Sequence, residues 1–341
     1  MNIKLEFLSE PKLQFGGYFE HESSKTGLAE AGPFGENIPG LHPSEIKLGF
    51  IGTLDTISSA KEWIDQCGST IESSNLKKIG QPVPSDVSSL FPDQAAESTE
   101  RTRLEKTLDP DFVGFNRDSP FKCCFQMNQR WERVIPHREL QGILSIEDKA
   151  HCIRQLISLF AGHIENLATT DPSPDIIILA LTSEITDQAH SVRISSNFHL
   201  NFRRAIKAEA MKWGVPIQLL KRRTAAGKGK DLQDKATRAW NFCTAQYYKA
   251  GGIPWRPTML DKDVCYVGIS FYVAQDVNDQ LTMRSSIAQA FDYLGQGLVL
   301  RGDPFKWNQN TQGMSPHLTK EGASQLIQRT LNEYMKVTGV P

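Results

Sequence analysis

The chain has 341 residues, 39% of them hydrophobic and 23% charged, with a formal net charge of −1. These values are ordinary for a globular protein with room for two domains, and no apolar run approaches the roughly 20 residues of a membrane-spanning helix. The N-terminus lacks the apolar stretch of a signal peptide, and the six cysteines have neither CxxC spacing nor a histidine cluster nearby. We therefore expect a cytoplasmic protein with free thiols and without a zinc site.

The first part of the chain predicts the opening of an α/β domain. Residues 1–45 are rich in Gly and Pro and predict extended segments and turns rather than a helix. An apolar run over 46–52 predicts a buried strand, and 58–66 predicts the helix that follows it. Residues 68–130 contain many Ser, Pro and acidic residues and predict an irregular insertion, in which the aromatic residues of 112–125 are partly buried.

Helix and strand patterns then alternate. Apolar residues recur at helical spacing over 145–167, and the apolar run 175–181 predicts a central parallel strand covered on both faces. Four further elements follow: a helix over 199–213, a strand over 216–220, a loop over 225–230 and a helix over 231–249. This order predicts a doubly wound, Rossmann-like domain that ends near Pro257. No GxGxxG follows the first strand, which argues against a dinucleotide site.

A second unit begins near Val264. Strand patterns cover 264–272, 281–291 and 297–301, although the 285–291 half of the second pattern also fits a helix. A helix over 319–335 follows, with Thr319 as its expected N-cap. Three strands and one helix are too few for an independent α/β domain. We therefore expect this chain to be a fragment, a truncated gene product or half of an assembly.

Charge is distributed unevenly along the chain. Between Asn201 and Arg256, thirteen Lys and Arg residues face three acids, a local balance of +10, so the rest of the chain carries −11. This polarity indicates a surface that binds a polyanion, with a solvated basic face as the alternative.

Four residues of the basic segment have the chemistry of a phosphate site. Arg203 and Lys207 are spaced i, i+4 on one expected helix, Gln218 is expected at the end of the next strand, and Lys249 lies near the end of the following helix. Ligands of doubly wound sheets collect outside the carboxyl ends of the strands, so we expect the four side chains to meet there. Arg offers a planar fork, Lys a point charge and Gln an amide donor. Scattered surface charge is the alternative.

Several strings in the same region carry a family resemblance. NFRRAIKA at 201–208 with PIQ at 216–218, LQDKATRAWN at 232–241 and YYKAGGIPW at 247–255 closely resemble the MID domain of short prokaryotic Argonautes. VGISFY at 267–272 and GLVLRG at 297–302 resemble the opening strands of their PIWI domain, and EPKLQFG at 10–16 and GFIG at 49–52 also fit. The resemblance covers nearly the whole chain and is most specific from 199 to 302.

The resemblance implies a site for the 5′ phosphate of a guide strand, formed by Arg203, Lys207, Gln218 and Lys249. Arg203 replaces the ring of the aromatic version, and its guanidinium plane can stack on the first base as well as pair with phosphate. We predict supporting nucleic-acid contacts from the same segment by Arg204, Lys221, Arg222 and Thr224. The resemblance implies that no cofactor is required, but it allows a Mg²⁺ ion at the guide 5′ phosphate. Trp240 and Trp255 are expected in the core.

The resemblance also implies the domain organisation and the lack of nuclease activity. It assigns 1–45 to an extended segment packing on the PIWI part, 46–257 to the MID domain and 258–341 to the N-terminal portion of an RNase H-like PIWI domain. Active members hold two metal ions with carboxylates, and Ser270 occupies the first such position, where it cannot bridge two cations. The remaining catalytic positions would lie beyond Pro341. The alternative metal ligands are Asp276, Asp279 and Asp303.

Short Argonautes usually act with an APAZ-containing protein that carries a TIR, sirtuin-like or nuclease effector. The resemblance therefore implies that this chain binds a guide and a complementary invader strand in prokaryotic antiviral defence, while a partner supplies the effector. The sequence does not distinguish an RNA guide from a DNA guide. Two alternatives stay open: a guided RNase H-type endonuclease, and a Rossmann-like enzyme that acts on a phosphorylated metabolite.

Overall fold

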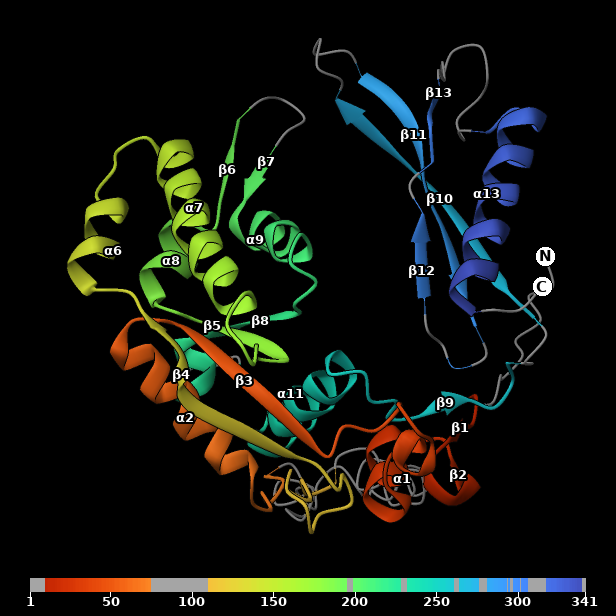
Figure 1. Ribbon diagram of the computed structural model, residues 1–341, viewed down its shortest axis with the longest axis horizontal. Coiled ribbons are helices and arrows are strands. Elements are labelled where there is room, and N and C mark those ends of the chain that lie inside the picture. The colour runs from red at the N-terminus through yellow and green to blue at the C-terminus, as the bar shows by residue number, and fades with distance from the viewer. Residues whose placement is uncertain are drawn as a thin grey trace, which may run out of the picture. The chain divides into compact units, whose positions relative to one another are not determined.

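The computed structural model describes residues 10–74, 110–194, 199–227, 232–260, 264–275, 281–292, 294, 297–300, 302–305 and 317–338. The chain forms two compact units, Met1–Trp255 and Arg256–Pro341 (Figure 1). The sequence placed this boundary between residues 257 and 258. No helix in the described ranges is long and apolar enough to cross a membrane.

A parallel four-stranded sheet organises the first unit. Its order is β4-β3-β5-β8, where the strands span Cys124–Val134, Glu45–Gly52, Ile176–Leu181 and Ile217–Lys221. All three neighbouring pairs are parallel, and β3, which comes first of the four in the chain, lies inside the sheet, so the chain winds outward from it in both directions. This arrangement confirms the predicted α/β class with a doubly wound sheet.

Helices cover both faces of this sheet (Figure 1). On one face lie α2 (Leu54–Cys67) and α11 (Lys235–Lys249), and on the other lie α7 (Lys149–Ala168) and α9 (Phe202–Met211). Strand β5 is fully buried because successive side chains point to opposite faces: Ile176 and Ile178 enter the core beside α2 and α11, whereas Ile177 and Leu179 enter the other. The apolar run 175–181 is therefore the central strand that it predicts.

Side-chain caps start the four helices that cover the sheet. Thr53 Oγ1 accepts from Thr56 N at α2, and Asp148 accepts from Ala150 N at α7. Asn201 accepts from Arg204 N at 3.0 Å at the start of α9, and Asp234 accepts from Ala236 N at 2.9 Å at α11. These oxygens satisfy amide groups that have no partner within the helix, and they determine where each helix begins.

The N-terminal segment differs from the prediction of extended structure. It contains β1 (Leu13–Gln14) paired with β2 (Glu20–His21), two 3-10 turns (Gly16–Tyr18 and Phe34–Asn37) and the helix α1 (Ser24–Ala31), capped by Ser23. Phe15 packs against Gly27, where a Cβ would lie 2.1 Å from the Phe15 ring. Phe15 and Leu28 belong to the core beside α11.

The prediction of an irregular insertion over 68–130 is wrong for its C-terminal part. Phe112, Phe115 and Phe121 are buried in the same core as Trp240, which confirms the expected burial of the aromatic run and of Trp240. Phe112 forms an isolated antiparallel bridge with Ile71, and strand β4 begins at Cys124. Strand β4 escaped prediction because it is an edge strand of mostly polar residues, without clear alternation. Residues 75–109 lie outside the described ranges.

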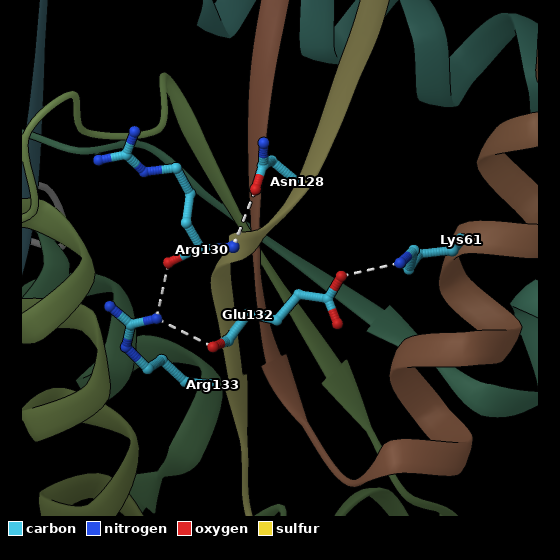
Figure 2. A network of polar contacts seen from close by, with 5 residues as sticks. All are labelled: Lys61, Asn128, Arg130, Glu132 and Arg133. Atoms are coloured by element: carbon cyan, nitrogen blue, oxygen red, sulfur yellow. Dashed lines mark hydrogen bonds and ion pairs between the residues drawn. The ribbon is translucent and has the colours of Figure 1, made fainter.

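Strand β4 is also interrupted by a bulge, since Met127 pairs with Leu48 but Glu132 pairs with Phe50. Figure 2 shows how the bulge is held: Arg130 N donates to Asn128 Oδ1 at 3.0 Å, and Arg133 Nη1 donates to the carbonyls of Arg130 and Glu132, both at 2.9 Å. The Glu132 carboxylate pairs with Lys61 of α2 at 2.8 Å. The charged groups of this edge therefore have partners on β4 and α2.

The remaining elements of the first unit are α6 (His137–Leu144), α8 (Ser183–Gln188), the hairpin of β6 (Ser191–Arg193) with β7 (His199–Asn201), and α10 (Arg222–Ala225). The helix predicted over 199–213 is thus a short strand followed by α9.

The second unit contains β9 (Arg256–Pro257), β10 (Tyr266–Gln275), β11 (Leu281–Phe291), β12 (Gly297–Leu300), β13 (Pro304–Phe305) and α13 (Lys320–Thr338). Strand β11 pairs with β10, β12 and β13, all antiparallel, so 285–291 is strand rather than helix.

Candidate nucleic-acid interface

The four predicted phosphate-binding residues gather along the edge strand β8. Gln218 is the second residue of β8, not its last, so the expectation that the cluster lies at the carboxyl ends of the strands is wrong. The cluster instead follows the outer side of β8, between α9 on one face of the sheet and α11 on the other. We call Arg203, Lys207, Gln218 and Lys249 the cation cluster.

Packing of α9 and α11 positions the cations. Phe202, Ile206 and Ala210 anchor α9 in the core beside α7, which leaves Arg203 and Lys207 exposed one turn apart. Lys249 is the last residue of α11, three residues after the fully buried Gln246. Gln218 shares the face of Leu220, whose side chain enters the core beside α11, so its amide points toward that helix.

Hydrogen bonds tie this cluster to the strand backbone. Lys249 Nζ donates to the Ile217 carbonyl at 3.0 Å and to Gln218 Oε1, and Gln218 Nε2 donates to the Leu219 carbonyl at 3.1 Å. The Pro216 carbonyl accepts from Ile177 N of β5 at 3.0 Å, so the alternate carbonyls of Ile217 and Leu219 face the open edge. The side chains of the cluster thus satisfy the acceptors of an edge strand that has no further strand beside it among the described residues.

The cations of the cluster lie close enough to repel one another. Burial, followed by the charges of Lys207 and Arg203, lowers the pKa of Lys249 to about 8. Among the described residues, no carboxylate lies within ion-pair distance of these three cations. A dianion placed there would offset the repulsion and accept hydrogen bonds from all three side chains.

A pocket of about 560 Å³ opens beside the cation cluster. Arg203, Lys207 and Gln218 line it, together with two of the predicted supporting residues, Lys221 and Thr224. Arg222 lines a separate cleft, and Arg204 lines neither cavity. The structure therefore brings together the four main residues and two of the four supporting ones.

The residues predicted for the degenerate metal site lie in the second unit. Ser270 is exposed on β10, where the pairing with β11 shifts between Ser270 and Phe271. Asp303 is exposed just before β13, whereas Asp276 and Asp279 lie outside the described residues. No group of three or more His, Cys, Asp or Glu side chains in the described ranges is arranged to hold a metal ion.

The cation cluster also does not fit Mg²⁺. Mg²⁺ prefers carboxylate and phosphate oxygens, and the cluster contributes cations and a single amide. The amide oxygen of Gln218 already accepts from Lys249 and from Gln246 Nε2, the latter at 3.4 Å. The described side chains therefore offer a phosphate group cationic donors rather than metal ligands.

No protein-family model and no curated protein matches the sequence. The chain is similar to solved structures of an Aquifex aeolicus Argonaute, of a Clostridium butyricum Argonaute bound to a guide DNA and a 19-mer target DNA, and of Drosophila Piwi. Their sequence identities are 11%, 10% and 10%, and their TM-scores are 0.44, 0.45 and 0.41. The matches cover 96%, 97% and 97% of this chain but only 35%, 34% and 32% of the other chains, so this chain spans about a third of their length. At this level of similarity the function of the site must be inferred from its own geometry.

Sequence reasoning missed two residues of the pocket wall. Gln246 is fully buried, with Nε2 donating to the Phe242 carbonyl at 3.2 Å and to Gln218 Oε1. Arg238 donates to the Thr224 carbonyl and lies 4.9 Å above the Trp63 ring. Gln246 was detectable, because a polar residue four positions after the buried Phe242 interrupts the apolar face of α11. The position of Arg238 could not be predicted from the sequence, because it depends on the contact with Trp63, which is remote in the chain.

Proposed function

We propose that this chain is a guide-binding module that anchors the 5′ phosphate of a nucleic-acid strand in the cation cluster. The observation that carries the proposal is a group of three cations beside a pocket. The charges of Arg203 and Lys207 act on Lys249, which bonds to the Gln218 amide, and no carboxylate in the described part of the chain lies within ion-pair distance of the three. Such an excess of positive charge is costly unless an anion binds.

The chemistry of each side chain supports a terminal phosphate. The guanidinium of Arg203 can contact two phosphate oxygens at once, whereas Lys207 and Lys249 supply compact charges. Gln218 keeps one N–H free beyond its bond to the Leu219 carbonyl. A terminal phosphate carries more charge than an internal phosphodiester, so it gains more from three cations.

The proposal includes the wider role that the sequence resemblance implies. The module recognises a complementary invader strand in prokaryotic antiviral defence, in the cytoplasm, and does not cut it because Ser270 cannot hold two metal ions. An APAZ-containing partner would carry the TIR, sirtuin-like or nuclease effector. Incubating the guide-loaded protein with labelled complementary DNA and RNA in Mg²⁺ or Mn²⁺ tests the inactivity, and discrete cleavage of either strand would contradict it.

Binding of matched oligonucleotides tests the central claim. We expect a strand of about 20 nucleotides to bind more tightly with a 5′ phosphate than with a 5′ hydroxyl. The double variant Lys207→Ala, Lys249→Ala should lose most of that preference, because each charge-assisted contact contributes about 1.5–3 kcal/mol. Equal affinity of the wild-type protein for both ends would refute the assignment. The ultraviolet absorbance of the freshly purified protein separates this function from that of a metabolite enzyme, because only a nucleic-acid-binding protein should copurify with nucleic acid.

A further inference from the structure

A second, larger cleft lies on the α2 side of the first unit. Its volume is about 920 Å³, and its walls come from α2, α10 and the start of α11. Four cations line it, Arg222, Arg223, Lys235 and Arg238, against the single carboxylate of Glu62. The sequence singled out only Arg222 among these residues.

The four cations have no ion-pair partner among the described residues. Arg222, Arg223 and Lys235 are exposed, so each side chain can reach a ligand in the cleft, although the charge of Arg222 also acts on Glu184 and that of Arg238 on Asp234. Ser59 and Gln66 add neutral hydrogen-bonding groups to the same wall. A concave surface with this balance of charge attracts a phosphate group and repels a cationic ligand.

Arg238 connects the two cavities. It lines both the 560 Å³ pocket and the 920 Å³ cleft, as does Trp63, so the cavities lie on either side of this stacked pair. Burial lowers the pKa of Arg238, and its buried Nε has no hydrogen-bond partner. A strand held by its end in the pocket therefore has a second cationic surface immediately next to it.

We propose that this second cleft binds an internal phosphate of the strand whose 5′ phosphate occupies the cation cluster. The inference rests on the proposed function for the choice of ligand, but the cleft itself is a separate site. A single strand presents one phosphate per nucleotide, so its backbone can contact both cavities, while a nucleoside 5′-monophosphate has no internal phosphate for the cleft. A free phosphate ion is the other source of the same chemistry.

Affinity as a function of ligand length tests the proposal. The variant Arg223→Gln, Lys235→Gln should weaken binding of a 5′-phosphorylated strand of about 20 nucleotides by at least about tenfold and leave a nucleoside 5′-monophosphate unaffected. The salt dependence of log K should become shallower by about 0.7 for each lost phosphate contact. The matched control is Lys149→Gln, Arg154→Gln, which removes one Lys and one Arg from exposed positions on α7 and should change neither affinity.

The other outcomes separate failure of the cleft from failure of the proposed function. Two results would assign the cleft to a free phosphate ion. One is an equal loss of affinity for the long strand and for the monophosphate in the Arg223→Gln, Lys235→Gln variant, and the other is competition by inorganic phosphate with the strand that is seen in the wild type but not in this variant. No loss with either ligand would remove it as a binding site. If the wild type shows no 5′-phosphate preference, the proposed function fails, whereas a loss confined to long strands with a 5′ hydroxyl would still support the cleft.

A different observation identifies a positioning residue beneath the cation cluster. Gln246 is fully buried, and its Nε2 reaches both the Phe242 carbonyl and Gln218 Oε1. Its own Oε1 is buried without a hydrogen-bond partner, so turning the amide over would place an oxygen against two acceptors. The orientation of Gln246 is therefore unique, and Gln218 Oε1 receives donors from both Gln246 and Lys249.

We infer that Gln246 keeps the amide of Gln218 turned with its NH₂ group toward the phosphate. With both donors on Oε1, the Gln218 amide cannot present its oxygen to the anion. The inference rests on the proposed function, since the orientation matters only if an anion binds. Retention of an unsatisfied buried oxygen in Gln246 fits a residue selected for binding rather than for stability.

The variant Gln246→Met, which keeps the shape and removes the donor, tests this role. We expect the 5′-phosphate preference to fall by about threefold to tenfold while affinity for the 5′-hydroxyl strand stays unchanged. Adding Gln218→Met should cause no further loss, and the exposed control Gln155→Met should have no effect. Equal losses for both strand ends, or an unchanged preference, would reduce Gln246 to a packing residue. A wild type without any preference would overturn the proposed function and this inference together.

Discussion

The two edge strands of the parallel sheet, β4 and β8, both have cationic side chains that donate to backbone carbonyls, but the two edges differ in charge balance. At β4, Arg133 donates to the carbonyls of Arg130 and Glu132, and the Glu132 carboxylate pairs with Lys61 (Figure 2). At β8, Lys249 donates to the Ile217 carbonyl beside two further cations, with no carboxylate partner in the described residues.

This difference distinguishes charges that stabilise the fold from charges that bind a ligand. Edge strands need their outward groups satisfied, and a cation on a strand that also contains an ion-paired carboxylate does this at little electrostatic cost. Charge that is left unbalanced, as at β8, destabilises the free protein and is explained by a ligand of opposite sign. The following predictions test this distinction, from the largest expected effect to the smallest.

Removing one cation from each edge should give opposite results in binding. Lys249→Met removes a charge-assisted contact to the phosphate, so affinity for a 5′-phosphorylated strand should fall by about 10- to 150-fold. Lys61→Met removes a cation of the same type whose partner is Glu132, and binding should stay unchanged. Fluorescence anisotropy with a labelled strand measures both. Comparable losses for the two variants would mean that net charge alone drives binding.

The affinity of the β8 site should depend on pH. The pKa of Lys249 is about 8 in the free protein, and a bound phosphate favours its protonated form, so affinity is highest below pH 8 and falls as the pH rises. Between about pH 7 and pH 9 the protonated fraction decreases roughly tenfold, while the phosphate stays a dianion. Isothermal titration across this range should show the decrease. Lys249→Arg, which does not titrate there, should flatten the profile, and an equally steep profile in that variant would contradict the assignment.

The paired charge at β4 should contribute to stability. Glu132→Gln should lower the free energy of unfolding by up to about 1 kcal/mol, because the Lys61–Glu132 pair is partly buried and 2.8 Å long. Denaturant unfolding of the single variants and of the double variant with Lys61→Met measures the coupling. Additive effects of the two substitutions would show that the pair is not a structural interaction.

The smallest effect is a gain in stability at β8. Arg203 and Lys207 are like charges one turn apart on α9, and such pairs destabilise a helix by about 0.2–0.5 kcal/mol, so Lys207→Met should raise the free energy of unfolding by that amount. Lys212→Met at the end of the same helix is the control. It removes a cation that pairs with Glu209 at 2.6 Å, so it should give no gain. A loss of stability in Lys207→Met would place Lys207 among the structural charges.

The sequence by itself determined the elements with strong periodicity or continuous apolar character. Strand β3, strand β5 and helix α7 were predictable because their burial follows from their own residues. The identity of the cation cluster was also predictable, since the spacing of Arg203 and Lys207 and the positive balance of the segment are properties of the chain. The three longer strands of the second unit, β10, β11 and β12, were predictable from their apolar patterns, whereas the two-residue strands β9 and β13 were not.

Only the tertiary structure decided where the cluster lies and what surrounds it. Strand β4 and the helix α1 are stabilised by contacts outside each element, such as Phe125 of β4 with Phe242 and Gly27 of α1 with Phe15, which local patterns do not record. The place of Gln218 at the open edge of β8, the buried Gln246 beneath it and the cleft behind Arg238 depend on which strand ends the sheet. The physical reason is that local propensity acts between neighbours along the chain. Charge balance and burial instead depend on residues that meet only after folding.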